Sequence, residues 1–492
     1  MLSLRPHLLQ ARLATMPFVK ALIPFAAGVV MAMHYLVPWW LLIGVIVLMG
    51  ILALKTERLL PQLLLFAAFG GLIASGRTDA TQPPLSEPAL YLIDVENDSA
   101  PRERGSAAEG HLIAWCNPNE GDWYAIDGFV QLRCDSLLSV SSGERRLVRG
   151  RIYPYRYGSP SFLRLMHNRG YWGSCYLNET NLLLREESPY GSLHRTASHA
   201  LKRRFEEQSS ASAVVRAMTI GDRSGIDPTL RNAYARSGMS HLLAVSGLHT
   251  GIIFTFINLL LIWLPLIRRG EVVRNLLAVA LIWIYVIAAG APPSAVRAAV
   301  MCSILQFALL GSSSYYAMNA WAAAAMAMLI WNPRWIGEIG FQLSFVAVAA
   351  ILLWGVPLCR LLRTRWGILN IVIHSLIIGF SASLSTAPLT AYAFGIVPLL
   401  GLALNPVVVL LGMVVVGCGL LILLIPPVSG WITPVALGAA RGLNELATRI
   451  AAHEEASVDL HLSGSSVCGI YLLFVAITLL MWCIERKKSV HL

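Results

Sequence analysis

One apolar stretch, HLLAVSGLH at residues 241–249, carries two histidines and a serine. A bilayer core holds no water to solvate such side chains, so each must meet a protein partner or line a hydrated cavity. On a single helix His241 and His249 would be offset by about 80° and would share a broad face with Ser246. This composition is typical of a path for a polar solute rather than of apolar filler.

Several chemistries are open to this stretch. The histidines could ligate a metal, but no third ligand is near in the sequence. They could hydrogen-bond backbone groups, or they could line a polyanion path, where neutral imidazoles donate to phosphate and protonated ones attract it. Ser246 and His249 could also act as nucleophile and base, although no acidic orienting residue lies near them.

Polar side chains recur in the apolar runs that follow. Arg297 is costly in a bilayer unless it is paired, hydrated or able to snorkel to the outer interface, and Glu338 could pair with it or with Arg334. The neutral polar residues could form interhelical hydrogen bonds worth about 0.6 kcal/mol each. We predict a channel lined by seven residues, which are His241, Ser246, His249, Arg297, Gln342, Ser344 and Asn405.

The elements that must position these residues are membrane spans. Of the 492 residues, 56% are hydrophobic and 13% are charged, whereas soluble proteins carry roughly 25% charged residues. Apolar runs near the length of about 20 residues needed for a crossing helix lie at 18–36, 38–54, 59–76, 240–264, 275–290, 294–311, 317–331, 341–358 and 467–484. The longer run 367–426 holds either one span with re-entrant pieces or three spans. The prediction is a polytopic α-helical membrane protein with ten or twelve spans.

Basic residues in the short loops give the orientation. They are Lys55, Arg58, Arg268, Arg269, Arg274, Arg360, Arg363, Arg365, Arg486, Lys487 and Lys488. Cytoplasmic loops carry the excess of Lys and Arg, so all of these are placed on the cytoplasmic side. Both termini are then cytoplasmic, and the polar segment 77–235 is outside an inner membrane.

The outside segment has the pattern of short strands. Runs of β-branched and aromatic residues at 110–116, 123–133, 145–153 and 172–177 alternate with turn signals. This spacing predicts a small OB-like β-barrel. The chain therefore divides into three N-terminal transmembrane helices (1–76), an external OB-like β-domain (77–194), an interfacial helical connector (195–239) and a transmembrane channel domain (240–492).

A basic patch lies within the β-domain. Between Arg145 and Arg169 there are seven arginines and no acidic residue. Guanidinium groups can neutralise phosphates while aromatic rings stack on bases; the alternative is a solvated strand face beside anionic lipid headgroups. We predict DNA binding by Arg145, Arg146, Arg149, Arg151, Tyr153, Tyr155, Arg156 and Tyr157.

Three cysteines fall in the outside segment, at 116, 134 and 175. Extracytoplasmic compartments are oxidising, which permits a disulfide. Cys134 and Cys175 each alternate with apolar residues that would face a core, so we predict that these two form a disulfide, which could stabilise the domain by about 3–5 kcal/mol.

A set of motifs resembles those of the competence-protein (Rec2-type) family of bacterial DNA-uptake membrane channels. The motifs are GDR at 221–223, HLLAVSGLH at 241–249, AGAPPS at 289–294 with Arg297, NP at 332–333, GFQLSF at 340–345, PLT at 388–390 and NP at 405–406. The outside segment is similar to the OB-like domain of that family, so the resemblance covers nearly the whole chain.

The resemblance implies that the chain conducts single-stranded DNA across the cytoplasmic membrane during natural transformation. Many members carry a metallo-β-lactamase-like nuclease domain, but no HxHxDH-type cluster occurs here, so we expect neither enzyme activity nor a metal or cofactor. The sequence also lacks a P-loop motif, which implies a cytoplasmic helicase-like motor and a periplasmic DNA-delivery protein as partners, and a homo-oligomer is compatible with the sequence. The alternatives are an intramembrane enzyme that uses Ser246 and His249 on a lipid-linked or peptide substrate, and a small-anion secondary transporter.

Overall fold

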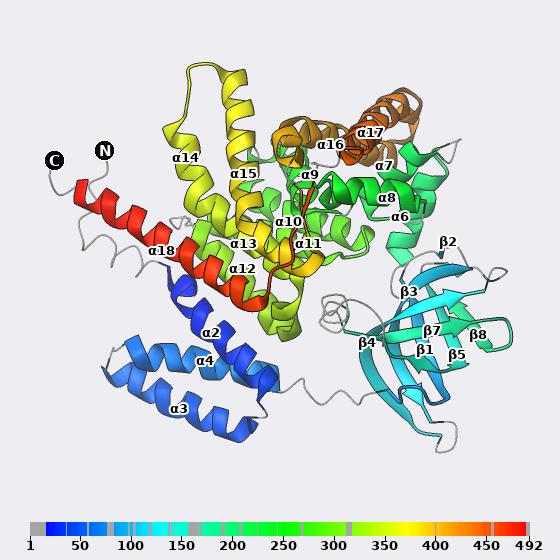
Figure 1. Cartoon of the computed structure of the whole chain (residues 1–492), viewed down its shortest axis with the longest axis horizontal. Coiled ribbons are helices and arrows are strands. Elements are labelled where there is room, and N and C mark those ends of the chain that lie inside the picture. The colour runs from blue at the N-terminus through cyan, green and yellow to red at the C-terminus, as the bar shows by residue number, and fades with distance from the viewer. Residues whose placement is uncertain are drawn as a thin grey trace.

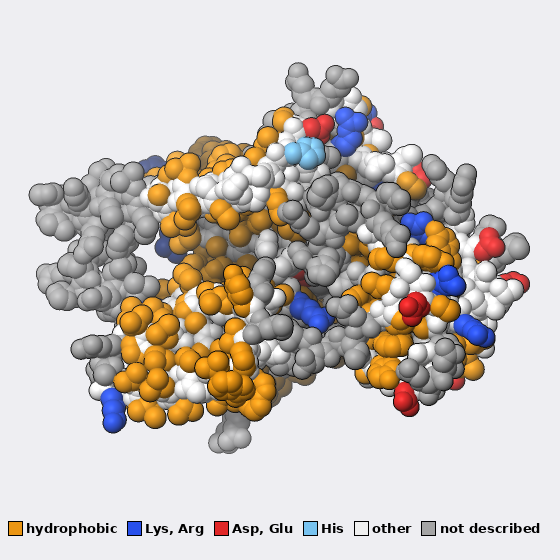
Figure 2. Space-filling model, turned by 60° about the horizontal axis from the view of Figure 1, so that its bottom comes forward, with side chains coloured by type: hydrophobic (Ala, Val, Ile, Leu, Met, Phe, Trp, Pro, Cys, Tyr) orange, Lys and Arg blue, Asp and Glu red, His pale blue; other side chains and the backbone are white. Residues whose placement is uncertain are grey.

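The computed structural model describes residues 16–488, with gaps at 36, 57–58, 76–82, 97–98, 102–104, 118–120, 136–137, 139, 142, 156–165, 167–169, 188–191, 206–208, 224, 244, 267–269, 311–316, 399 and 454–456. Helices form most of the chain, and the strands β1 to β8 gather in one β-domain beside the helical body (Figure 1). Hydrophobic side chains cover much of the visible surface of the N-terminal helices, whereas charged side chains are spread over the β-domain (Figure 2).

The chain begins with a bundle of three apolar helices, α2 (Pro17–His34), α3 (Trp39–Thr56) and α4 (Leu59–Ser75). Helices α2 and α4 cross closely at two glycines: a Cβ on Gly28 would lie 1.8 Å from the Ala67 carbonyl oxygen, and one on Gly70 would lie 2.2 Å from that of Phe25. Small residues permit such backbone approach in membrane helices. The bundle packs through α2 against α12 (Ala317–Trp331), in a core that includes Phe25.

The β-domain is one curved sheet of eight strands, β1 (Ala89–Val95), β2 (Ala100–Pro101), β3 (Ser106–Cys116), β4 (Trp123–Cys134), β5 (Glu144–Gly150), β6 (Ile152–Tyr153), β7 (Tyr171–Leu177) and β8 (Leu182–Glu187). The order is β6-β7-β4-β3-β1-β5-β8, with β2 on β3. Only Arg151 separates β5 from β6, and these two strands pair with opposite ends of the order, so the sheet curls back on itself. Neighbouring strands are antiparallel except β4 and β7, which are parallel.

Three short helices follow, α6 (Ser192–Lys202), α7 (Ser210–Ile220) and α8 (Pro228–Arg236). Every residue of α7 after Ser210 is buried, because α6, α16 (Leu400–Leu424) and α17 (Ser429–Ala451) all pack against it. Protein therefore encloses most of α7, and the interfacial position of the connector 195–239 stays a prediction.

The remaining helices are α9 (Gly247–Leu260), α10 (Gly270–Ala288), α11 (Pro293–Leu310), α13 (Ile339–Ala350), α14 (Val356–Leu361), α15 (Gly367–Phe394) and α18 (Gly464–Lys488), with short 3₁₀ turns η1 (Ser240–Leu242), η2 (Leu264–Leu266), η3 (Pro333–Gly337) and η5 (Pro426–Val428) and a π-helical segment η4 (Ile351–Gly355). The run 367–426, predicted as one or three spans, is two helices. Gly395 ends α15 at φ +71°, and the strand β9 (Ile396–Pro398), which pairs with β10 (Ser457–Asp459), leads into α16.

By length and composition, five helical segments in the described part of the chain could cross a membrane: Gly247–Leu266, Gly270–Ala288, Ile339–Leu361, Leu369–Phe394 and Val407–Leu424. Shorter apolar helices include the three N-terminal ones, α11, α12 and part of α18. The chain is therefore a membrane protein with a β-domain.

Candidate functional site

The stretch 241–249 is not one helix. Helix α9 begins only at Gly247, and His241 lies on the separate turn η1. The predicted common helical face of the two histidines is therefore wrong: His241 is exposed, with Nδ1 3.1 Å from the Gly238 carbonyl oxygen, whereas His249 is fully buried. The two histidines lie on different elements because Ser246 adopts an extended backbone as the N-cap of α9, which begins at Gly247.

Ser246 and His249 form a reciprocal cap at the start of α9. The Ser246 hydroxyl accepts a hydrogen bond from the backbone amide of His249 at 3.3 Å, and His249 Nδ1 accepts one from the amide of Ser246 at 3.3 Å. An acceptor Nδ1 places the ring proton on Nε2. Since Nδ1 is occupied by an amide, it does not take the Ser246 hydroxyl proton in this arrangement, which disfavours the nucleophile-and-base alternative.

The motifs that are distant in the sequence meet around this cap. Ser294, in the first turn of α11, donates its hydroxyl proton to the Val245 carbonyl. Arg223 Nε donates to the Leu243 carbonyl at 2.8 Å. Gly221, at φ +80°, lies so close to α10 that a Cβ there would be 3.0 Å from the Ala289 carbonyl oxygen. The residues at 221–223, 241–249 and 289–294 thus form one packed unit.

Arg297 lies one turn after Ser294 and is only 4% exposed. Its Nε and Nη1 have no hydrogen-bond partner within the part of the chain that the structure describes. Glu338, which precedes α13, is the charged group whose field reaches the guanidinium. The guanidinium is therefore enclosed between helices, and snorkelling to the outer interface does not describe its position.

The other predicted lining residues have different surroundings. Gln342 Nε2 donates to the Ile336 carbonyl at 2.8 Å, so this amide fastens α13 to η3. Ser344 is half-buried on α13. The side chain of Asn405 lies outside the described residues. The starts of α9 and α11 lie side by side, since a Cβ on Gly247 would be 3.8 Å from that of Ala298, and α11 also contacts α13.

Two buried polar links on α11 were not among the predicted residues. Gln306 Nε2 donates to Asn258 Oδ1 at 2.9 Å, and Trp283 Nε1 donates to Ser303 Oγ at 3.1 Å. Ser303 and Gln306 are three residues apart, so they share a helix face. Polar residues at that spacing within an apolar run are the signal that could have identified them.

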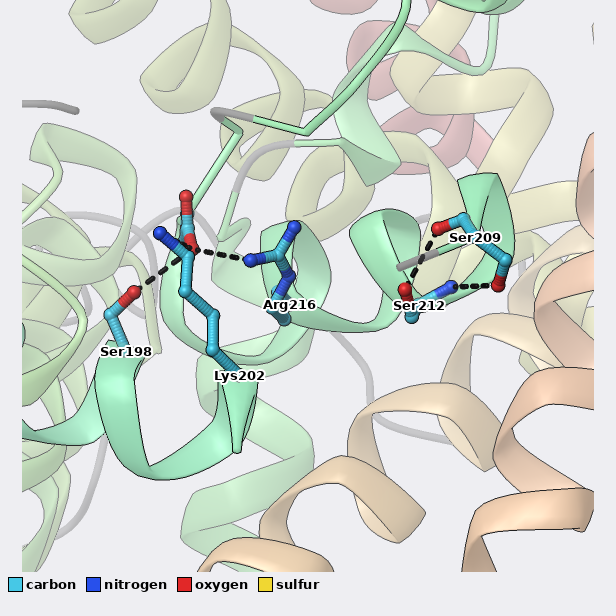
Figure 3. Close-up of polar contacts among 6 residues, drawn as sticks. Ser198, Lys202, Ser209, Ser212 and Arg216 are labelled. Atoms are coloured by element: carbon cyan, nitrogen blue, oxygen red, sulfur yellow. Dashed lines mark hydrogen bonds and ion pairs between the residues drawn. The ribbon is translucent and has the colours of Figure 1, made fainter. Parts of the chain in front are cut away.

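A buried ionic cluster joins the connector helices to the GDR motif (Figure 3). Asp222 Oδ2 accepts from Ser198 Oγ at 2.9 Å and from Arg216 Nη1 at 3.4 Å, and Lys202 Nζ lies 3.7 Å away. Asp222, Arg216 and Ser198 are all buried. The cluster fixes α6 and α7, which follow the β-domain in the sequence, to the loop between α7 and α8.

The predicted DNA-binding patch is divided by the fold. Arg145 makes a bidentate ion pair with Asp94, at 2.7 and 2.9 Å, and Arg146 is buried against Glu144, with its Nε 3.0 Å from Oε2. Cross-strand and interior carboxylates therefore occupy these two guanidinium groups, so their part in DNA binding stays a prediction. The structure leaves Arg149, Arg151 and Tyr153 exposed and Tyr155 half-buried, while Arg156 and Tyr157 lie outside the described residues.

An aromatic face lies on the outer side of β3, β4, β7 and β6. It comprises His111, Phe129, Arg133, Tyr153, Tyr171 and Tyr176, of which only Tyr153 was among the predicted residues. The Phe129 ring centroid is 5.2 Å from that of His111 and 5.5 Å from that of Tyr171. Arg133 lies over the Tyr176 ring at 5.6 Å and donates to its hydroxyl at 3.1 Å. Alternation along β4, with Phe129 and Arg133 outward, was the available signal.

Cys134 and Cys175 are both buried but carry free thiols, so the predicted disulfide is not formed. In the parallel register, Cys175 pairs with Leu132 and Cys134 with Leu177, which places the cysteines diagonally. Diagonal neighbours on adjacent strands lie about 7–8 Å apart, beyond the usual Cα separation of a disulfide. Burial raises the pKa of Cys175 to about 12 and raises that of Cys134 as well.

Comparisons with known proteins agree with the arrangement of the motifs. The family model described as Competence protein matches residues 218–487. The chain is 33% identical over 199 residues to ComE operon protein 3 of Bacillus subtilis (strain 168), covering 40% of this chain and 24% of that protein. It is 30% identical over 156 residues to Competence protein ComA of Neisseria gonorrhoeae, covering 29% of this chain and 21% of that protein. No solved structure matches.

Proposed function

Because the chain belongs to the competence-protein family, we propose that it acts in DNA uptake and passes single-stranded DNA inward across the cytoplasmic membrane. The observation that carries the proposal is the packed unit of polar motifs at the starts of α9 and α11, which all fall within or beside the family match. Polar groups held inside apolar helices are expected where a hydrophilic substrate crosses.

The proposed topology has twelve crossings. Helices α2, α3 and α4 supply three, and α9, α10, α11, α12, α13 with α14, α15, α16, α17 and α18 supply nine. With the basic loops in the cytoplasm, the β-domain is outside and both termini are inside. Helices α9, α11 and α13 then all begin at the outer face, where their positive N-terminal dipoles favour an approaching anion.

The β-domain is proposed to receive the strand. Because β5 and β6 act as one strand, five strands close the sheet in the order β1, β3, β4, β7 and β5–β6. One neighbouring pair, β4 and β7, is parallel, and this arrangement suits the OB type. The aromatic face offers rings for bases and Arg133 for a phosphate or a ring. Stacking contributes about 1–3 kcal/mol per base. We place the DNA contact on this face, with Arg149 and Arg151 as flanking phosphate contacts.

The proposed partners supply the driving force for transport and the delivery of DNA. The sequence has no P-loop, so a cytoplasmic helicase-like motor would pull the strand, and a periplasmic DNA-delivery protein would present it. Assembly of the chain as a homo-oligomer is also part of the proposal. The region of similarity spans about a quarter or less of each curated relative.

The experiment that tests the function is deletion of the gene in a transformable host that has no paralogue, followed by measurement of labelled DNA entering the cytoplasm. We expect uptake to be lost and to return with the intact gene on a plasmid. Normal cytoplasmic uptake in the deletion strain would end the proposal.

The proposed DNA contact on the aromatic face has a separate test, which uses the full chain in nanodiscs. Replacing Tyr176 with alanine should weaken binding of a single-stranded oligonucleotide by about tenfold, since 1.4 kcal/mol is a factor of ten, and the effect should persist at high salt. Arg149→Ala should instead reduce the salt dependence. A larger loss with Arg149→Ala than with Tyr176→Ala would move the contact from the aromatic face to β5.

A further inference from the structure

Three arginines are buried among the described residues, and they differ in their partners. Arg146 is paired with Glu144 and Arg216 with Asp222. Arg297 has no such carboxylate within ion-pair distance, and both its Nε and its Nη1 are buried without a hydrogen-bond acceptor in the described part of the chain. A buried guanidinium with unused donors is costly, because the charge and the lost hydrogen bonds are both uncompensated.

The surroundings of Arg297 favour an anion. It is on the second turn of α11, beside the start of α9, where a Cβ on Gly247 would be 3.8 Å from the neighbouring Ala298. The first turns of both helices therefore direct their positive dipole ends into the same region. Ser246 and Ser294 are already engaged, with the His249 amide and the Val245 carbonyl, so the guanidinium holds the unused donors.

Glu338 is the acidic group close enough to act on Arg297. It stands at the first position before α13, and it accepts no hydrogen bond from Nε or Nη1 of Arg297. The carboxylate therefore reduces the local positive potential without filling the donors of Arg297. An arrangement of this kind holds an anion weakly enough to release it.

We propose that Arg297 is a phosphodiester-binding residue of the transport path, with Glu338 as the positioning residue that limits how tightly the phosphate is held. This inference rests on the proposed function and specifies its substrate contact. A planar guanidinium binds two oxygens of one phosphate through parallel N–H groups. Repeated binding and release along the strand requires moderate affinity, which the nearby carboxylate provides.

A purely structural role makes a different prediction. If Arg297 and Glu338 only neutralise each other, removing both charges in Arg297→Gln/Glu338→Gln should restore what either single change removes. If Arg297 binds phosphate, the double variant should remain as defective as Arg297→Gln. The matched control is Arg216→Gln/Asp222→Asn, a buried pair in which the double variant should recover relative to Asp222→Asn.

The experiment measures cytoplasmic uptake of labelled DNA and, on the purified full chain in nanodiscs, the affinity for a fluorescent single-stranded oligonucleotide. We expect uptake to fall at least tenfold in Arg297→Gln and to remain low in the double variant. Arg297→Lys should be intermediate. Glu338→Gln should bind the oligonucleotide several-fold more tightly, and this gain should vanish with an uncharged methylphosphonate backbone.

Wild-type uptake in Arg297→Gln, or recovery in the double variant, would overturn the inference. If Arg297→Gln does not fold, as judged by its elution profile, Glu338→Gln decides: unchanged affinity for the charged oligonucleotide overturns the proposal. Failure of this inference can be distinguished from failure of the proposed function. Uptake lost on gene deletion but normal in Arg297→Gln removes only the phosphate contact, whereas normal uptake on deletion removes the proposed function itself.

Discussion

The contact of α7 with α16 gives a sharp test of how the connector is held. A Cβ on Gly419 would lie 2.0 Å from Thr219 Oγ1, 3.1 Å from its Cβ and 3.1 Å from its Cγ2. Rotation of the Thr219 side chain relieves only part of this overlap, because the Thr219 Cβ stays 3.1 Å from the added carbon in every rotamer. The Gly419→Ala variant must therefore push α16 away from α7.

The expected cost can be worked out from this geometry. Overpacking a tight contact costs about 1–3 kcal/mol, and alanine returns roughly 0.8–1 kcal/mol through its better helix propensity. The net destabilisation is about 0–2 kcal/mol. With an unfolding entropy of about 2.1 cal/mol/K per residue, 2 kcal/mol lowers the Tm of a 492-residue chain that unfolds as a unit by about 2 °C.

The assay is thermal unfolding of the detergent-purified chain, with two matched variants. Gly417→Ala on the same helix meets nothing within 4 Å, so it should leave the Tm unchanged or raise it. Thr219→Ala/Gly419→Ala removes both Oγ1 and Cγ2, so it should recover most of the loss. A Tm for Gly419→Ala equal to that of Gly417→Ala would refute the close approach of α7 and α16.

Further expectations concern other contacts. Gly28→Ala should loosen the N-terminal bundle by about 1–3 kcal/mol because its Cβ would meet a backbone oxygen, whereas Gly50→Ala, which faces open space, should be neutral in the same Tm measurement. Asp222→Asn should cost about 3 kcal/mol because it leaves buried cations uncompensated, whereas Glu445→Gln, at an exposed ion pair, should change the Tm little. The thiol of Cys175, whose pKa burial raises to about 12, should remain protonated and resist iodoacetamide at pH 8 until the chain is denatured, as mass spectrometry would measure; rapid labelling of the folded chain would contradict its burial.

Local patterns were sufficient for the large divisions of the chain. The low charge content and the long apolar runs identified a membrane protein, and alternation with turn signals located the β-domain. Both signals are local, since they depend on whether each residue faces water, lipid or a core. The motif at 241–249 was likewise recognisable, because polar groups in an apolar run are expensive anywhere in a bilayer.

Side-chain partners were beyond the reach of the sequence. Arg145 and Arg146 appeared available for DNA, but strand pairing brings Asp94 and Glu144 to them. The aromatic face arises only when β4 and β7 lie in parallel, across a gap of dozens of residues. Such partners come from register and topology, which no short window contains.

By itself, the sequence determined which segments are apolar enough to cross a membrane and which have the alternation of strands, because hydropathy and alternation are properties of consecutive residues. It also determined which charged side chains fall within or beside apolar segments. Only the tertiary structure decided which of those charges are already neutralised. Arg216 meets Asp222, whereas Arg297 keeps unused donors, because helix packing sets distances between residues that the chain separates.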